Sequence, residues 1–308
     1  MQKQVDSVHR ARALHGWIIL DKPVGPESTQ MVSAVKRALR EAGEPKTKVG
    51  HGGTLDPLAS GVLPIAIGEA TKLAGRMLDA TKAYDFTIRF GEETDTLDAE
   101  GAVVATSAVR PTREQVSAVL DRFTGEISQV PPVYSALKLG GKAAYARARA
   151  GEEVEMVART VTIHALELKD DGGSVDEITL SATVSKGTYI RSLARDIARA
   201  VGTVGQVTML RRTRAGPFTL DRAISLDFLN EAAKAQALDG AVLPLALALD
   251  DIPALPVDSG QAMLLRQGQR LAGFPAQPGL ALATHDDRPV ALVEALADGL
   301  RVVRGFNI

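Results

Sequence analysis

The sequence predicts an α+β protein in which a large domain over residues 1–250 precedes a small β-rich domain over residues 251–308. Residues 84–90 alternate between apolar and polar side chains, which is typical of a half-buried strand. Residues 192–201 place apolar side chains at helical spacing, which is typical of an amphipathic helix. Short β-like runs separated by turn residues occupy the end of the chain. Strands mixed with helices in this way favour the α+β class.

Caps and turn residues define the first elements. Residues 16–20 are apolar throughout and predict a buried strand, which a loop with two prolines and a glycine ends. Ser28 or Thr29 is expected to cap a helix. The apolar residues on one face of that helix are Met31, Val32, Val35 and Leu39. A second buried strand is expected at 61–68 and a second helix at 69–80.

The later elements follow from the same signals. Thr112, or Pro111 before it, is expected to begin a helix that runs to about residue 123. Residues 126–157 contain a Pro-Pro pair and a Gly-Gly turn, so we expect a projecting basic arm rather than core. A linker is expected at 250–256. The remaining expected strands are 161–168, 178–184, 280–284, 289–294 and 300–303.

Composition excludes several classes of protein. The chain has no cysteine, and its five histidines lack zinc-like spacing, so we expect no disulfide and no metal site. The longest apolar stretch, at 241–249, is too short to span a bilayer. The first sixteen residues lack the apolar core of a secretory signal. A cytoplasmic protein that does not bind membranes is therefore expected.

Charge is balanced overall but unevenly distributed. The formal net charge is -1, yet residues 186–214 carry seven basic residues and one acidic residue. Residues 136–151 carry four basic residues and no acid, whereas residues 221–300 carry eleven acidic and five basic residues. Such asymmetry indicates a nucleic-acid-binding face on the first two thirds of the chain. For any one of these runs, a solvated helix face is the alternative interpretation.

Residues 50–57, with the sequence GHGGTLDP, form the segment richest in chemical signals. Gly52 and Gly53 let a backbone approach a ligand closely, and a proline after Asp56 keeps that aspartate out of the helical region. From these residues alone, a turn capped by Asp56 remains the simpler interpretation. A phosphate-binding P-loop is excluded because no Lys-Ser/Thr pair follows, and an esterase is excluded because no G-x-S-x-G motif is present.

The wider pattern resembles the bacterial tRNA pseudouridine-55 synthase family, called TruB. Residues 50–73, GHGGTLDPLASGVLPIAIGEATKL, are similar to its signature. Further similar blocks occur in the family's order, and they are DKPVG at 21–25, KAY at 82–84, VYSALK at 133–138, SKGTYIRS at 185–192 and LRR at 210–212. With these blocks, the resemblance extends over roughly residues 16–230. The chain differs from the family where PEST at 26–29 replaces its usual residues, so the resemblance implies no contacts for these four residues.

The resemblance implies a pseudouridine-synthase fold with a central mixed, largely antiparallel β-sheet flanked by helices, followed by a PUA-like C-terminal domain. It implies conversion of uridine 55 to pseudouridine in the T-stem-loop of tRNA. It also implies a monomer that needs neither a cofactor nor a protein partner. Base flipping is required, because a stacked uridine cannot present C1′ and both faces of its base.

The resemblance also implies roles for three catalytic residues. Asp56 is the carboxylate that acts at C1′ of the uridine or assists cleavage of its glycosidic bond. Arg191 is its ion-pair partner, and a guanidinium beside a carboxylate maintains the ionised form. Tyr84 stacks on the target base and helps to remove the C5 proton. Without the resemblance, Tyr84 would be assigned to the core and Arg191 to a phosphate contact.

The remaining site residues are implied to bind the substrate. Leu210 lines the pocket beside the base, and His51 fills the space that the flipped nucleotide vacates. Lys22 supports the Gly-rich loop or contacts RNA. Tyr189 lies two residues before Arg191, so on an extended chain both side chains would point towards one site. Gly52 and Gly53 allow close approach to the backbone.

Two alternatives remain open. A dyskerin-type relative would share the Gly-rich aspartate motif but would work inside a guide-RNA particle. A tRNA-binding or folding factor would use the same scaffold without catalysis. The arm at 126–157 favours a standalone enzyme, because an enzyme without a guide must hold its own substrate. The joint presence of Asp56, Tyr84 and Arg191 argues against lost catalysis.

Overall fold

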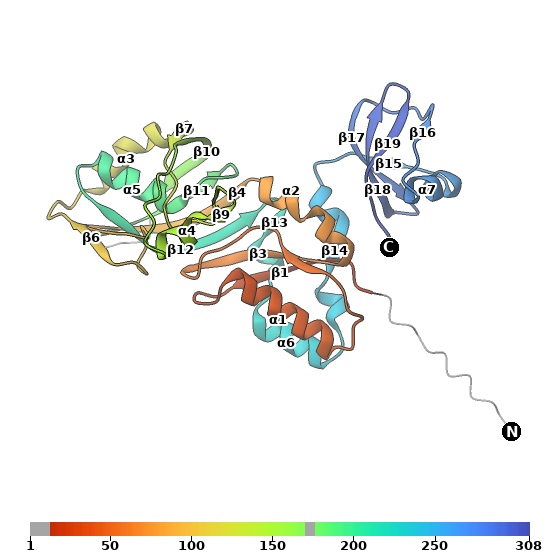
Figure 1. Cartoon of the computed structure of the whole chain (residues 1–308), viewed down its shortest axis with the longest axis horizontal. Helices are drawn as coiled ribbons and strands as arrows, with labels where there is room; N and C mark the ends of the chain where they lie inside the picture. The colour runs from red at the N-terminus through yellow and green to blue at the C-terminus, as the bar shows by residue number, and fades with distance from the viewer. Residues whose placement is uncertain (1–12, 170–175) are drawn as a thin grey trace.

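A ten-stranded mixed β-sheet forms the frame of the larger part of the molecule (Figure 1). The structure is a computed structural model and describes residues 13–169 and 176–308, so most of the N-terminal segment assessed for a signal lies outside the described residues. The main path of the sheet is β14-β1-β3-β12-β4-β11-β10-β7, with β2 paired to β3 and β13 to β12. Strands β3 and β12 pair in parallel, and the other described strand pairs of this sheet are antiparallel.

Strands β1, β3, β4, β10 and β11 of this sheet lie close to where the sequence predicts strands, and the other five were not predicted. The strands of the sheet are β1 (Gly16–Lys22), β2 (Val49–His51), β3 (Ala59–Ile67), β4 (Lys82–Phe90), β7 (Gly125–Gln129), β10 (Arg159–Leu168), β11 (Glu177–Val184), β12 (Gly205–Ala215), β13 (Phe218–Thr219) and β14 (Leu243–Pro244). Two small hairpins lie outside the sheet and consist of β5 (Glu92–Thr94) with β6 (Val103–Thr106) and β8 (Lys138–Leu139) with β9 (Lys142–Ala143).

Helices cover this sheet and connect its strands. Helix α1 (Ser28–Glu41) packs beside α6 (Leu226–Lys234), and α5 (Ile190–Ala200) packs on β4 and β12. The other helices are α2 (Ala74–Asp79), α3 (Arg113–Leu120), α4 (Ala144–Arg149) and α7 (Ser259–Arg266). The 3-10 helices are η1 (Gly68–Leu73), η2 (Asp121–Phe123), η3 (Leu220–Arg222), η4 (Leu238–Ala241) and η5 (Leu245–Leu249). In the described part of the chain, no helix is long and apolar enough to cross a membrane.

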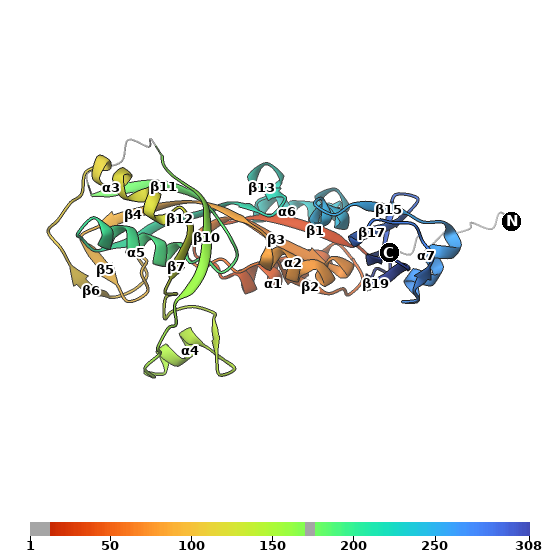
Figure 2. The ribbon, with the colours of Figure 1, turned by 90° about the horizontal axis from the view of Figure 1, so that it is seen from above.

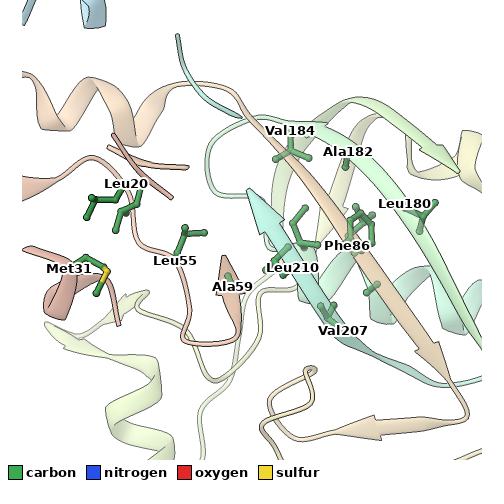
Figure 3. Close-up of a cluster of buried hydrophobic side chains, with 14 of the residues drawn as sticks. Leu20, Met31, Leu55, Ala59, Phe86, Leu180, Ala182, Val184, Val207 and Leu210 are labelled. Carbon is green, nitrogen blue, oxygen red and sulfur yellow. The ribbon is translucent and has the colours of Figure 1, made fainter. Parts of the chain in front are cut away.

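The largest core lies between the sheet and these helices, and it extends up to the Gly-rich loop. Leu20, Met31 and Leu55 lie on one side of the view in Figure 3, and Phe86 and Leu210 lie on the other. Leu55 is 4% exposed and directly precedes Asp56 in the chain. Burial of one leucine side chain stabilises a fold by about 1.5–3 kcal/mol. The core therefore fixes the loop through Leu55 while Asp56 stays near the surface.

The structure corrects two of the predicted helices. Glu27, not Ser28 or Thr29, caps α1, through a capping box with Gln30. The predicted helix at 69–80 is divided into η1 and α2. The cap expected at Thr112 is confirmed, because its side chain accepts a hydrogen bond from the backbone N–H of Gln115 at 3.3 Å.

Two predicted boundaries are also corrected. Residues 125–129 form β7, which pairs with β10 in the main sheet, so the projecting arm begins after residue 129 rather than at 126. Residues 254–256, expected to belong to a linker, form strand β15. In both places, backbone hydrogen bonds to a distant strand decide the structure, and local turn residues give no sign of that partner.

A five-stranded sheet forms the C-terminal part of the chain, in the order β15-β17-β18-β19-β16. Its strands are β15 (Ala254–Pro256), β16 (Leu271–Ala272), β17 (Gly279–His285), β18 (Arg288–Leu296) and β19 (Gly299–Gly305). It lies at one end of the elongated molecule (Figure 2). Leu282, Leu292 and Phe306 share a buried cluster with Trp17 and Phe218 of the larger part. Apolar contacts therefore join the two parts.

Candidate active site

The Gly-rich loop runs from the end of β2 to the start of β3, and two glycines allow its path. The N–H of Gly52 donates to the carbonyl of Pro64 at 2.8 Å, so the loop stays on the sheet. A Cβ atom at Gly52 would lie 2.7 Å from Cβ of Met77, which leaves no room for a side chain. Gly53 has a φ of 139°, which side chains disfavour. Both glycines shape the loop that presents Asp56.

Two buried polar side chains hold the backbone of this loop. Arg212 is 1% exposed, and its guanidinium donates to the carbonyls of Val62, Thr54 and Gly53 at 2.7, 3.2 and 3.2 Å. Ser28 accepts a hydrogen bond from the N–H of Leu55 at 2.8 Å and donates to its carbonyl at 3.0 Å. The loop therefore has fixed hydrogen bonds on both sides of its turn.

Lys22 is fully buried and binds the part of the same loop that follows Asp56. Its ammonium donates to the carbonyls of Pro23, Pro57 and Ala59 at 2.9, 3.3 and 2.5 Å. Burial lowers the pKa of Lys22 to about 8, while the charges of Asp56 and Glu100 act in the opposite direction. Because Lys22 is 0% exposed, this position fits loop support and does not fit RNA contact.

We expect Lys22→Met to lower the free energy of unfolding by about 1–3 kcal/mol, because buried carbonyls lose their donor. Since the folded pKa, about 8, lies below the usual 10.5, stability should rise as the pH increases through that interval, and the variant should lack this rise. Urea unfolding at several pH values measures both effects. Lys234→Met, at an exposed lysine of α6, is the control and should change stability little. Equal stabilities of the two variants would contradict the role of Lys22.

The carboxylate of Asp56 forms an ion pair with Arg191. The distance from Oδ2 of Asp56 to Nη2 of Arg191 is 2.8 Å, and the side chains are 38% and 7% exposed, respectively. The guanidinium also donates to the carbonyls of Thr96 and Tyr134 at 2.8 and 3.0 Å. These contacts hold Arg191 in one orientation, so its charge faces Asp56 while Asp56 keeps access to solvent.

A second carboxylate, that of Asp98, lies on the buried side of Arg191. Its Oδ2 is 3.3 Å from Nη1 of Arg191, and its side chain is 4% exposed. Asp98 also accepts hydrogen bonds from the hydroxyl of Thr96 at 2.6 Å and the N–H of Glu100 at 3.1 Å. Partial burial, and then the charges of Asp98 and Asp56, raise the pKa of Glu100. Arg191 therefore lies between a buried carboxylate and an accessible one.

An open pocket of about 330 Å³ lies over Asp56. Its walls come from loop residues 53–56, Leu78 of α2, the start of β4, residues 135–137 of the arm, residues 184–185 and 187–191, and β12. Its volume is at the lower end of the range for small-ligand sites, about 300–1,000 Å³. The pocket suits one nucleotide rather than a helical segment of RNA.

The structure brings six of the nine predicted site residues to this pocket, namely Gly53, Asp56, Tyr84, Tyr189, Arg191 and Leu210. Gly52 and Lys22 are not part of its wall and act on the loop behind it. His51, at the end of β2, accepts a hydrogen bond on Nδ1 from the N–H of Gly53 at 3.4 Å. Burial, and then the charge of Arg212, lower the pKa of His51, which favours a neutral imidazole at pH 7.

The prediction that Tyr189 and Arg191 lie on one extended segment is wrong. Tyr189 is the N-cap of α5 and Arg191 lies inside that helix, so the two residues are not on one extended strand. Both side chains still reach the pocket, because the helix begins at its wall. The N–H of Tyr189 donates to Oε1 of Gln129 at 2.9 Å, which fixes the start of the helix.

The basic residues of 186–214 do not form the continuous phosphate-contacting stretch that their charge predicts. Arg191 and Arg212 are 6% and 1% exposed and bind groups inside the protein. Four others are in ion pairs, and these pairs are Lys186–Asp79, Arg195–Asp196, Arg199–Glu93 and Arg211–Asp21. Asp196 belongs to the same segment, but the net charge of the segment does not reveal Asp79, Glu93 and Asp21, which come from distant elements.

Comparisons with known proteins match this architecture. A family profile described as TruB family pseudouridylate synthase (N terminal domain) matches residues 36–190. A second, described as tRNA pseudouridylate synthase B C-terminal domain, matches residues 191–250. The chain belongs to the TruB family of pseudouridylate synthases. The resemblance found in the sequence and the predicted fold class are thereby confirmed.

Two relatives of this TruB chain are similar over nearly their whole length. The tRNA pseudouridine synthase B of Zymomonas mobilis subsp. mobilis is 61% identical, over 96% of this chain and 97% of that protein. The protein of the same name from Novosphingobium aromaticivorans is 60% identical, over 95% and 97%. A chain in the crystal structure of a Cbf5-Nop10-Gar1 complex has a TM-score of 0.71 at 26% identity, over 95% of this chain and 85% of that one.

The TruB sequence blocks meet at the pocket. Five of the six blocks supply residues to its walls, and the sixth, at 21–25, contributes Lys22 behind the loop. Sequence reasoning missed Asp98, Arg212 and Ser28. The LRR block marks the position of Arg212, but Asp98 lies in a stretch rich in acidic residues that carries no distinctive signal. The sequence predicts Ser28 as a helix cap, and its hydrogen bonds with the backbone of Leu55 can be seen only in the structure.

Proposed function

We propose that this protein converts a uridine of tRNA to pseudouridine, at position 55 in the T-loop, with Asp56 as the catalytic carboxylate. The observation that carries the proposal is the ion pair between Asp56 and the buried Arg191 at the floor of a nucleotide-sized pocket. The names of relatives about 60% identical to this chain support tRNA as the substrate. Tyr84, Tyr189 and Leu210 supply apolar and aromatic surface for the base.

The reaction exchanges one bond of C1′ for another. The bond from N1 of uracil to C1′ breaks, the uracil turns within the pocket, and C5 bonds to C1′. The proton of C5 then passes to water, and N1 takes up a proton from water, so the product is an isomer of the substrate. Asp56 either bonds to C1′ or assists cleavage of the glycosidic bond. The negative charge of Asp56 stabilises the positive charge that develops at C1′. Tyr84, on a pocket wall, is positioned to stack on the base and assist removal of the proton. No redox change or external group is needed.

Three residues support the site in this proposal. Arg191 orients Asp56 and favours its charged form. His51 occupies the position from which the nucleotide is flipped, and its neutral imidazole can enter the RNA stack without adding charge. The loop of Gly52 and Gly53 keeps Asp56 fixed, because a rigid catalytic group loses less entropy in the reaction.

The domain division at residue 250, the monomeric state and activity without a protein partner are parts of the same proposal. A cytoplasmic location, where the protein would encounter unmodified tRNA, is also part of the proposal.

The guide-dependent alternative is less well supported, since the similar chain in the H/ACA RNP structure is 25% identical, whereas the synthase B relatives are about 60% identical. A folding factor would not require the ion pair of Asp56.

Release of tritium from unmodified tRNA labelled at C5 of uridine tests the proposed activity. We expect the purified protein alone to release one tritium per tRNA, and a tRNA with cytidine at position 55 to release none. Release that requires an added guide particle would support the dyskerin-type alternative. Measurable tRNA binding without release would support the folding factor. Either result would contradict the proposal.

A further inference from the structure

Five exposed cations lie on the second half of α1 and in the loop that links α1 to β2. They are Lys36, Arg37, Arg40, Lys46 and Lys48. Among the described residues, none of the five has an ion-pair partner, in contrast to the paired cations of residues 186–214. Like charges gathered without counterions raise the local potential and favour an anionic ligand.

Four of these cations line a hollow of about 720 Å³, which we name the α1 hollow. They are Lys36, Arg40, Lys46 and Lys48. Glu44 also lines the hollow, so cations outnumber acids there by four to one. The surface is hollow rather than flat, and its charges come from both a helix and the loop that follows. Such a surface can contact one phosphate chain from two sides.

The α1 hollow is continuous with the catalytic loop. Val49 and Gly50 of β2 line the hollow, and Gly53 lines the catalytic pocket. Because extended chain spans at most about 3.6 Å per residue, Gly50 lies within about 22 Å of Asp56. In Figure 2 the arm that carries α4 projects to the same side of the sheet as α1, α2 and β2. A ligand in the pocket can therefore extend towards both.

We propose that the α1 hollow binds phosphates of the same RNA whose nucleotide enters the catalytic pocket. The inference rests on the proposed function for the identity of the RNA. Counterion release makes each neutralised phosphate contribute to affinity and to its salt dependence. Because two cations of 186–214 are buried and four are in ion pairs, the unpaired cations of the α1 hollow supply phosphate contacts beyond those of this stretch.

An anionic membrane fits the same surface less well. A helix that binds a bilayer inserts an apolar face beside its cations. The apolar face of α1 is buried in the core, with Met31, Val35 and Leu39 at most 4% exposed. Leu39, Pro45 and Val49 also line the hollow, but α1 has no exposed large hydrophobic side chain that could anchor a bilayer, which favours a polyanion in solution.

Charge-reversal variants test the α1 hollow. Lys36→Glu/Arg40→Glu and Lys46→Glu/Lys48→Glu should each weaken binding of unmodified tRNA by about tenfold, measured by filter binding over a range of salt concentrations. The slope of log affinity against log salt should become shallower by about 0.7–0.9 for each contact removed. Lys36→Arg/Arg40→Lys, which keeps the charges, should bind nearly as wild type. Thermal unfolding confirms that each variant is folded.

Arg122→Glu/Arg266→Glu is the matched control, since it reverses two exposed cations outside the hollow. Unchanged affinity and slope in both hollow variants would overturn the inference, as would an equal loss in the control. Loss of binding to phosphatidylserine vesicles with tRNA binding intact would assign the hollow to membranes and also overturn it. Failure of the proposed function is distinguishable, because it appears as absent tritium release by the wild-type protein.

Discussion

Asp56→Asn should lower the rate of pseudouridine formation by a factor on the order of 10⁴ or more, as loss of an essential nucleophile does in other enzymes. Asparagine has nearly the same shape, so it fits the turn before Pro57. It lacks the negative charge that the reaction at C1′ requires. The variant therefore separates the charge of the side chain from its size.

The fold should tolerate this substitution. Arg191 retains Asp98 as a counterion and keeps its hydrogen bonds to the carbonyls of Thr96 and Tyr134. Asp56 is 38% exposed, so asparagine there can be solvated. We therefore expect thermal stability close to that of the wild type and binding of tRNA within about threefold, since phosphate contacts dominate affinity.

Single-turnover tritium release with excess enzyme measures the rate without product release. Asp251→Asn is the matched control, because Asp251 also accepts from an arginine, Arg76, at 2.9 Å, but in a surface ion pair. The control should react at the wild-type rate. If Asp56→Asn reacted at a rate within tenfold of the wild-type rate, Asp56 would not be the catalytic carboxylate, even though it forms an ion pair with Arg191.

The strands could be predicted where burial has a regular period. Residues 84–90 alternate because β4 has neighbours on both edges and one face on the main core, and Phe86 and Ile88 are fully buried there. The predicted arm begins too early because its signals, the Pro-Pro pair and the Gly-Gly turn, lie after residue 129, and no local signal marks its start. Strand β7 exists because β10 offers a free edge, and this partner is distant in the chain.

The motif predicted the members of the candidate site, but not the contacts between them. Glycine and proline around Asp56 indicate a rigid turn, and this local signal is present in the sequence. Burial of Arg212 and Lys22 gives no such signal, because a charged residue in a sequence is expected at the surface. Their partners are backbone carbonyls, which every residue has, so no residue pattern marks them.

Arg191→Met should lower both stability and activity, and the two losses have different causes. Asp98 would be left as a buried carboxylate without a cation, which costs about 3–5 kcal/mol. Asp56 would lose the guanidinium that orients it, and we expect turnover to fall by about 10²–10³-fold or more, in the range of losses for electrostatic groups. The loss of stability thus comes from unpaired Asp98, and the loss of turnover comes from Asp56 without its guanidinium partner.

A second substitution separates these effects. Asp98→Asn removes the buried charge, and the remaining carbonyl oxygen can still accept from Thr96 and the N–H of Glu100. Arg191→Met/Asp98→Asn should therefore recover most of the lost stability, because a buried charge without its partner is worse than neither charge. It should not recover turnover, since the partner of Asp56 is still missing.

Urea unfolding and single-turnover tritium release on the same three variants measure the separation. Asp98→Asn alone should leave Arg191 paired with Asp56, so its turnover should fall less than that of Arg191→Met. Recovery of turnover together with stability in the double variant would show that Arg191 acts only through the fold. Recovery of stability alone would assign to Arg191 the orientation of Asp56 during the reaction.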